Sequence, residues 1–100
     1  MKTPRYNLKA KVWLYPGKAG WHFVNVSKKV SSDIKELFGA GSQGFGSLPV
    51  IVTVGSTSWR TSIFPDKKSE TYLLPIKADV RKKENILAGA SLHFMIVIRI

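Results

Sequence analysis

The chain contains no cysteine, two histidines and only 6 acidic residues. Without cysteine it forms no disulfide, no thiolate zinc site and no iron–sulfur cluster, and it has no thiol nucleophile. No uncharged apolar stretch approaches the roughly 20 residues that a membrane-spanning helix needs, and the N-terminus lacks the apolar core of a signal peptide. We therefore expect a cytoplasmic protein that makes no contact with a membrane and carries no cofactor and no metal.

The few acidic residues stand against 16 lysines and arginines, which gives a net charge of +10 at pH 7. Such a charge favours polyanions, nucleic acid among them, as partners. The basic residues are spread along the chain rather than gathered in one block, which is also the pattern of a charged surface that only keeps a protein soluble. The second interpretation is slightly favoured. With 100 residues, 44% of them hydrophobic, the chain is expected to fold as a single domain over residues 1–100.

The first half of the chain predicts a hairpin followed by a helix. Residues 7–15 alternate as a half-buried strand, and residues 21–26 are β-branched and aromatic, with turn residues between the two segments. From residue 28 the period becomes helical. Ser27, Ser31 or Ser32 would cap this helix, and Gly39 and Gly41 end it. The inward positions are expected at Leu8, Ala10, Val12 and Leu14 in the first strand and at Val30, Ile34, Leu37 and Phe38 in the helix.

The second half predicts four more strands and a second helix. Residues 48–54, 58–64 and 70–74 have strand character, and Pro75 suits the first turn of a short helix that carries residues 77–83. Trp59 is expected to point inward. The last strand, residues 91–100, is apolar on one face and partly apolar on the other, so it is either central in the sheet or at a subunit contact. The protein is therefore expected to be a monomer or a homodimer.

Six short strands with two brief helices predict a mainly β protein, a small closed or nearly closed six-stranded β-barrel. A set of short motifs points to a family. They are Trp59-Arg60-Thr61-Ser62, Phe64-Pro65, Leu74-Pro75 and Val80-Arg81, with Gly44-Phe45-Gly46 and Gly55 upstream. With these motifs the chain resembles the domain-of-unknown-function family numbered nineteen-oh-five, a set of small bacterial and archaeal proteins with no established activity. The resemblance implies a six-stranded pseudo-barrel, similar to the double-split barrels of swapped-hairpin transcriptional regulators.

Arg60, Lys77 and Arg81 form the sharpest candidate site. Lys77 and Arg81 are four residues apart on the expected helix and so project from one face, near free backbone N–H groups at its start. A cation at that end of a helix is unfavourable unless something negative joins it, so a phosphate or carboxylate would resolve the conflict. Thr61 and Ser62 would add hydroxyl groups to such a site. The alternative is that Lys77 points to solvent and Arg81 pairs with an acidic side chain, namely Asp66, Asp79 or Glu84.

Other groups of residues give weaker support for a function. Ser62 as a nucleophile would need a base, and His22 and His93 lie in different strands with no spacing that links them to Ser62 or to a metal site. The expected context of a dinucleotide loop, a strand followed by a helix, is missing at Gly44-Phe45-Gly46. This segment is more simply interpreted as a bend that lets Phe45 reach the core. Gln43, just before it, stands where the family often has arginine. Trp13, Tyr15, Trp21 and Trp59 with Lys9 and Lys11 suggest a stacking platform for single-stranded nucleic acid.

The sequence thus favours a non-catalytic binding or interaction module for an anionic ligand, a small anion or a phosphate-containing molecule. The ligand-binding residues are expected to be Arg60, Thr61, Ser62, Lys77 and Arg81. A nucleic-acid-binding protein is one alternative, and an enzyme of unassigned type that uses the same pocket is another. We assign no catalytic residue.

Overall fold

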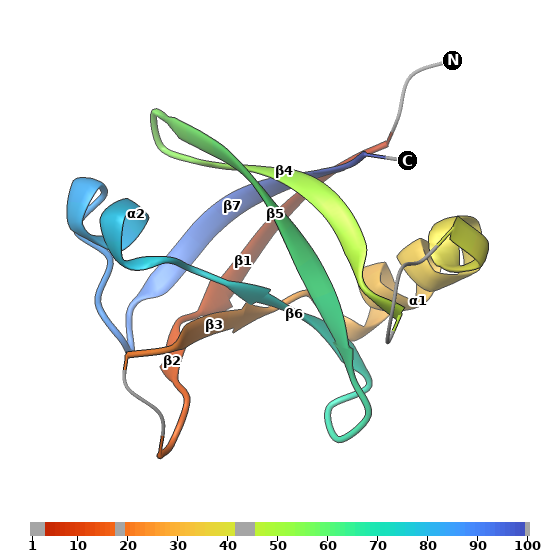
Figure 1. Ribbon diagram of the computed structural model, residues 1–100, viewed down its shortest axis with the longest axis horizontal. Coiled ribbons are helices and arrows are strands. Elements are labelled where there is room, and N and C mark those ends of the chain that lie inside the picture. The colour runs from red at the N-terminus through yellow and green to blue at the C-terminus, as the bar shows by residue number, and fades with distance from the viewer. Residues whose placement is uncertain (1–3, 18–19, 42–45, 100) are drawn as a thin grey trace.

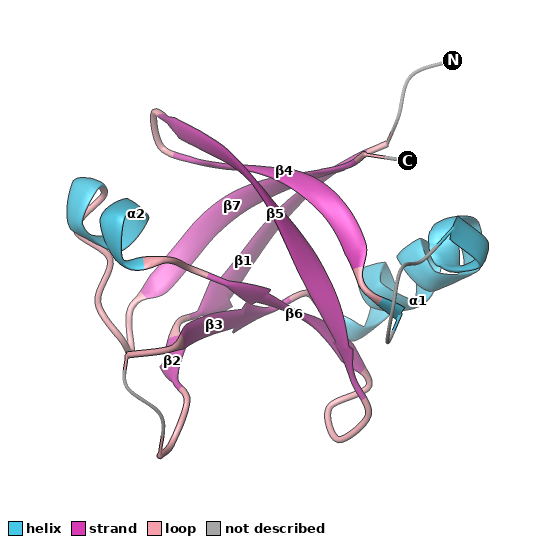
Figure 2. Cartoon of the chain, in the orientation of Figure 1, coloured by secondary structure: helices cyan, strands magenta, loops and turns pink. Residues whose placement is uncertain are grey.

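The computed structural model describes residues 4–17, 20–41 and 46–99. Seven antiparallel strands form one curved sheet in the order β1-β7-β4-β5-β6-β3-β2, with two helices at opposite sides of it (Figures 1 and 2). The elements are β1 (Arg5–Lys11), β2 (Trp13–Leu14), β3 (His22–Asn25), α1 (Lys28–Phe38), a short 3₁₀ helix (Gly39–Gly41), β4 (Leu48–Val54), β5 (Thr57–Asp66), β6 (Thr71–Pro75), α2 (Ala78–Lys83) and β7 (Ser91–Ile98).

The mainly β class is confirmed, but the six-stranded closed barrel is corrected to a seven-stranded half-barrel. The extra strand arises because the segment predicted as one strand divides at Val12. Its backbone N–H donates to the carbonyl of Ala90 and its carbonyl accepts from Gly89 N–H, so β1 stays beside β7 while β2 turns to pair with β3. The break also shifts the alternation: Val12 is buried as expected, whereas Leu14 is 53% exposed instead of facing the core.

The core lies on the concave face of this sheet. The inward residues of β4 and β7 are almost fully buried, and Trp59 on β5 is 8% exposed, as its predicted inward orientation requires. β7 is central, since it pairs with β1 on one side and with β4 on the other. Its second face, with Met95 and Val97, is only half-buried. Of the two explanations for that apolar face, the structure therefore supports the central strand.

Helix α1 closes one end of the half-barrel, and its start and inward face follow from particular side chains. Ser27 caps it, because its hydroxyl accepts from Val30 N–H at 3.3 Å. Ile34 is fully buried, and Val30 and Phe38 pack against the core. Leu37, expected on the same stripe, is 63% exposed, so that part of the prediction is wrong. The helix turns a narrower face to the sheet than the apolar pattern indicated.

Ser31 takes the inward position that the pattern did not assign to the core. Its hydroxyl donates to the Val26 carbonyl at 3.1 Å and accepts from Tyr72 N–H at 2.9 Å, so it joins α1 to β6 within the core. Ser31→Ala should lower the free energy of unfolding by about 1–3 kcal/mol, because a buried backbone N–H loses its acceptor. Ser32→Ala, an exposed neighbour, should change it by less than about 0.5 kcal/mol. Urea unfolding of the two variants checks this, and equal stabilities would contradict it.

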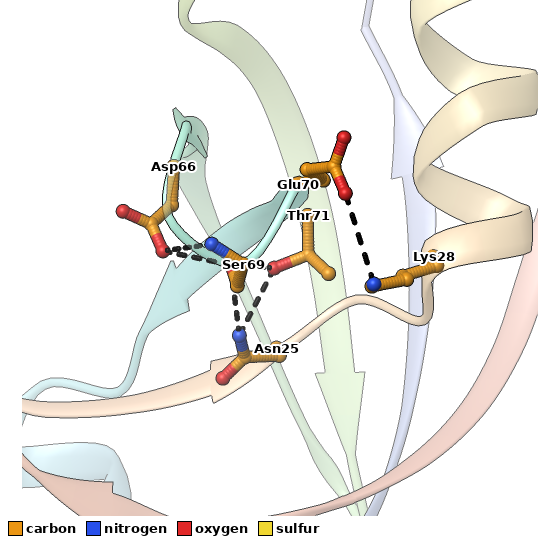
Figure 3. A network of polar contacts seen from close by, with 6 residues as sticks. All are labelled: Asn25, Lys28, Asp66, Ser69, Glu70 and Thr71. Carbon is orange, nitrogen blue, oxygen red and sulfur yellow. Dashed lines mark hydrogen bonds and ion pairs between the residues drawn. The ribbon is translucent and has the colours of Figure 1, made fainter.

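A polar network fastens the turn between β5 and β6 to β3 (Figure 3). The Ser69 hydroxyl donates to Asp66 Oδ2 at 2.7 Å, and Asn25 Nδ2 donates to Thr71 Oγ1 at 2.9 Å. Asn25 Oδ1 also accepts from Trp13 Nε1 at 2.6 Å, so the same amide holds the indole on β2. The network thus connects the β5–β6 turn with the aromatic side chains of the β2–β3 ribbon.

Helix α2 begins later than the sequence indicated. Pro75 is the last residue of β6 rather than part of the first helical turn, and the helix starts at Ala78 with Lys77 as its N-cap residue. Its far end is fixed to the β4–β5 hairpin, where the Glu84 carboxylate accepts from the Thr57 hydroxyl at 2.6 Å. The expectations for Gln43, Gly44 and Phe45 concern residues outside those described. No helix among the described residues is long and apolar enough to cross a membrane.

Candidate functional site

The site lies where β5 and β6 separate. Their ladder covers only three residue pairs, from Asp66↔Thr71 to Phe64↔Leu73, after which the strands diverge (Figure 1). Continued in the same register, the ladder would have placed Arg60 opposite Lys77. It stops because Pro75 has no N–H to donate and because Ile76 N–H turns instead to the His22 carbonyl on β3, at 2.9 Å. The sheet is therefore split between segments that its register would otherwise have paired.

A cleft of about 630 Å³ fills this split. Four of the five residues predicted from the sequence line it together, although they come from two separate segments of the chain. The fifth, Ser62, does not line it and lies opposite Pro49 of β4. Sequence reasoning did not place His22 in this site, and it assigned Trp21 to a separate aromatic platform, yet both residues line the cleft. The full lining is Gly20, Trp21, His22, Trp59, Arg60, Thr61, Pro75, Ile76, Lys77, Ala78 and Arg81.

Arg81 reaches back from α2 to the chain around β3. Its Nη1 lies 3.0 Å from His22 Nδ1 and 3.4 Å from the carbonyl oxygens of Gly20 and Ile76. Since His22 Nδ1 is also 2.7 Å from the Gly20 carbonyl, that nitrogen either donates to the carbonyl or accepts from Arg81, depending on the tautomer. The predicted alternative, pairing of Arg81 with Asp66, Asp79 or Glu84, is not seen, and Arg81 forms no ion pair within the described residues.

Arg60 on β5 and Lys77 at the start of α2 line the two walls of the cleft. The Arg60 side chain is exposed and makes no hydrogen bond or ion pair with any described residue. Lys77 Nζ lies 3.9 Å from Asp79 Oδ2, and both side chains are more than half exposed, so this ion pair contributes little. Asp79 nevertheless supplies negative charge in the first turn of α2. The start of this helix therefore does not by itself require an external anion, contrary to the argument from sequence.

The cleft is cationic because no aspartate or glutamate is among the described residues that line it. Three basic residues, Thr61 and Trp59 are among the residues that line a space large enough for a small organic molecule. Two other hollows carry a smaller excess of positive charge. One, lined by β1, β4 and β7, contains a single lysine, and the other contains three lysines together with Asp66 and Glu70. Of the three hollows, the split therefore has the largest excess of basic over acidic side chains.

An aromatic cluster borders the cleft on its β3 side. Trp21 and Phe23 stack with ring centroids 5.8 Å apart and an interplanar angle of 19°. Trp13 and Tyr15 pack against Phe23 at 5.2 and 6.0 Å. The predicted platform of four aromatics is thus present in part, since Trp59 is buried and is not among the ring contacts of this cluster, whereas Phe23 is. Trp21 belongs both to this cluster and to the lining of the cleft.

The described residues offer little support for a catalytic or a metal-binding site. His22 lies on β3 and His93 on β7, which are not neighbours in the sheet. The described residues contain no group of three or more histidine, aspartate or glutamate side chains that could hold a metal ion. Burial raises the pKa of Tyr72, and burial together with the nearby Asp33 carboxylate raises that of Tyr6, but neither phenol lines the cleft.

Comparison with known proteins identifies the family without adding an activity. No curated protein matches the chain significantly. A family model, described as a domain of unknown function (DUF1905), matches residues 9–96. That match spans the chain from β1 to β7 and includes both walls of the cleft. The chain therefore belongs to the DUF1905 family, as the tryptophan-arginine-threonine-serine and leucine-proline elements on these walls indicated.

Proposed function

We propose that the protein is a non-catalytic binding module for a small anionic ligand, held in the split between β5 and β6. One observation supports this above the others: three basic side chains from two separate segments border a cleft that no described acidic side chain lines. Like charges brought together without counterions repel one another, and an anion between them removes that repulsion. The proposal rests on these side chains and not on the start of α2, where Asp79 already supplies negative charge.

The three basic residues contribute differently. Arg81 donates to two backbone carbonyls, and also to His22 in the tautomer in which Nδ1 is an acceptor, so little side-chain freedom is lost when it binds. The Arg60 side chain has no partner among the described residues and offers its planar guanidinium for a bidentate contact with phosphate or carboxylate. Lys77 must exchange its weak contact with Asp79 for the ligand. Thr61 adds a hydroxyl on the β5 wall. Ser62, away from the cleft, has no part in this proposal.

Phosphate, sulfate or citrate should raise the melting temperature of the protein. A ligand that binds only the folded state at about 100 times its dissociation constant stabilises it by about 2.7 kcal/mol, which amounts to well over 5 °C in a domain of this size. Backbone amide signals of residues 60–61 and 76–79 should shift during the titration. Arg81→Gln and Arg60→Gln should reduce the thermal shift to less than half of its wild-type value.

Lys29→Gln provides the matched control, because it removes the same charge from an exposed position on α1 that lines no cleft. If the anion acted only by screening the net charge of +10, the three variants would lose the thermal shift equally. Equal losses, or amide shifts scattered over all basic surfaces, would contradict the proposal. Selective loss in the two arginine variants would support it.

A further inference from the structure

We infer that the anion taken by this cleft carries a planar aromatic ring, as a nucleoside phosphate does, and that the ring stacks on Trp21. The inference rests on the proposed anion site and adds the chemical class of its ligand. Six large apolar residues are exposed among those described: Leu14, Tyr15, Trp21, Leu37, Phe64 and Leu87. Of these, Trp21 alone lines the cationic cleft.

The register of the sheet explains why Trp21 lies beside the positive charges. β3 pairs with β6 with Phe23 opposite Pro75, so the same register continued by two residues brings Trp21 opposite Lys77. On the other side of Lys77 the β5–β6 ladder has already ended, so Arg60 borders the cleft from the β5 wall and is not a paired neighbour of Lys77. The same-face period of two residues therefore predicts that Trp21 and Lys77 lie side by side on one face. Trp21, Lys77 and Arg60 all line the cleft.

The Trp21 side chain is ordered by its neighbours and still exposed enough to stack on a ligand ring. Phe23 stacks on one side of the indole, and 54% of the residue remains exposed. Phe23 is itself fixed by Trp13 and Tyr15, and Trp13 is held by Asn25 through its indole N–H. A tryptophan that is already ordered loses little conformational entropy when a second ring stacks on it. Stacking with a base contributes about 1–3 kcal/mol in proteins that bind single strands.

The size of the cleft also favours a ligand larger than an inorganic anion. Its volume of about 630 Å³ lies in the middle of the range of small-molecule sites, about 300–1,000 Å³. A phosphate between Arg60 and Lys77 would leave most of that space empty. Nucleoside phosphates combine an anionic group, a spacer and a planar ring in one molecule. Such a ligand comes either free or as one unit of a single strand, and the two sources share the recognition proposed here.

The test compares four probes on the folded protein: adenosine monophosphate, adenosine, inorganic phosphate and a single-stranded deoxyadenosine octamer. Dissociation constants come from amide and indole N–H signals in NMR titrations. Adenosine monophosphate should bind more tightly than phosphate or adenosine and should shift the Trp21 indole signal. Trp21→Ala should weaken the binding of adenosine monophosphate by about 5- to 150-fold while changing the affinity for phosphate less than about twofold. Arg60→Gln should weaken the binding of both ligands.

Leu37→Ala is the control for loss of an exposed apolar side chain and should leave all affinities unchanged. The inference is wrong if adenosine monophosphate binds no tighter than phosphate, or if Trp21→Ala leaves its affinity within twofold of wild type. In that case phosphate binding that depends on Arg60 would still support the anion module. If phosphate also fails to bind, the proposed function falls with it.

The octamer distinguishes the two sources. When one nucleotide binds, the cleft neutralises one phosphate. The affinity for adenosine monophosphate should therefore fall only about threefold between 50 and 200 mM salt. A strand that contacts four or more phosphates should lose about 50-fold over the same range, and its affinity should still depend on Trp21. Octamer binding that is indifferent to Trp21→Ala would overturn the stacking role of this residue.

Discussion

Ile34→Ala should lower the free energy of unfolding by about 2–5 kcal/mol. Ile34 is fully buried at the inner face of α1, where the helix closes one end of the half-barrel. Truncation removes three buried carbon atoms and leaves a cavity, because the surrounding strands are tied together by their ladders and collapse only partly. For a domain of about 100 residues this is a large share of a total stability near 5–15 kcal/mol. Urea or thermal unfolding measures it.

Two variants on the same helix serve as controls for the stability of Ile34→Ala. Leu37→Ala, at a residue that is 63% exposed, should change stability by less than about 0.5 kcal/mol. Phe38 is half-buried, so Phe38→Ala should fall between the two variants. The apolar stripe read from the sequence predicts comparable losses at all three positions. Equal losses would therefore show that α1 docks with the broader face and would contradict the orientation described here.

Gly55→Ala should destabilise the protein by about 2–3 kcal/mol. Gly55 opens the two-residue turn between β4 and β5 with φ at +57°, a left-handed conformation that costs other residues about 1–2 kcal/mol. A Cβ atom at this position would also run into the Glu84 carboxylate. That carboxylate would have to move, which breaks its contact with the Thr57 hydroxyl and adds about 1 kcal/mol. Thermal unfolding of the variant gives the total.

A double-mutant cycle with Glu84→Ala separates the two contributions. In the Glu84→Ala background the Cβ atom has no carboxylate to displace, so Gly55→Ala should cost only about 1–2 kcal/mol there. An identical loss of stability from Gly55→Ala in both backgrounds would show that the Glu84 carboxylate does not restrict residue 55. The contact also bears on binding, because Glu84 ends the helix that carries Arg81. Loosening it should disturb the position of that guanidinium in the cleft.

The sequence by itself determined the buried and exposed faces correctly in the regular strands β5 and β7. The alternation around Trp59 and along β7 predicted inward and outward residues, because a pleated strand between two neighbours has a fixed period of two. Ser27 was among the predicted caps, and its hydroxyl accepts from Val30 N–H. The family resemblance also followed from sequence alone. Of the five residues that the sequence predicted for an anion site, three cations and a threonine line the same cleft and Ser62 does not.

Only the tertiary structure decided where the patterns break and what they bring together. The division of the first strand at Val12 depends on backbone contacts with Gly89 and Ala90, nearly eighty residues away, which periodicity in a short window does not contain. The exposure of Leu37 depends on how α1 is rotated on the sheet, and a stripe of apolar residues fixes that rotation only loosely. The cleft exists because the ladder of β5 and β6 stops after three pairs. That split places Trp21 beside Arg60, Lys77 and Arg81, because register across strands, not distance along the chain, determines which side chains meet.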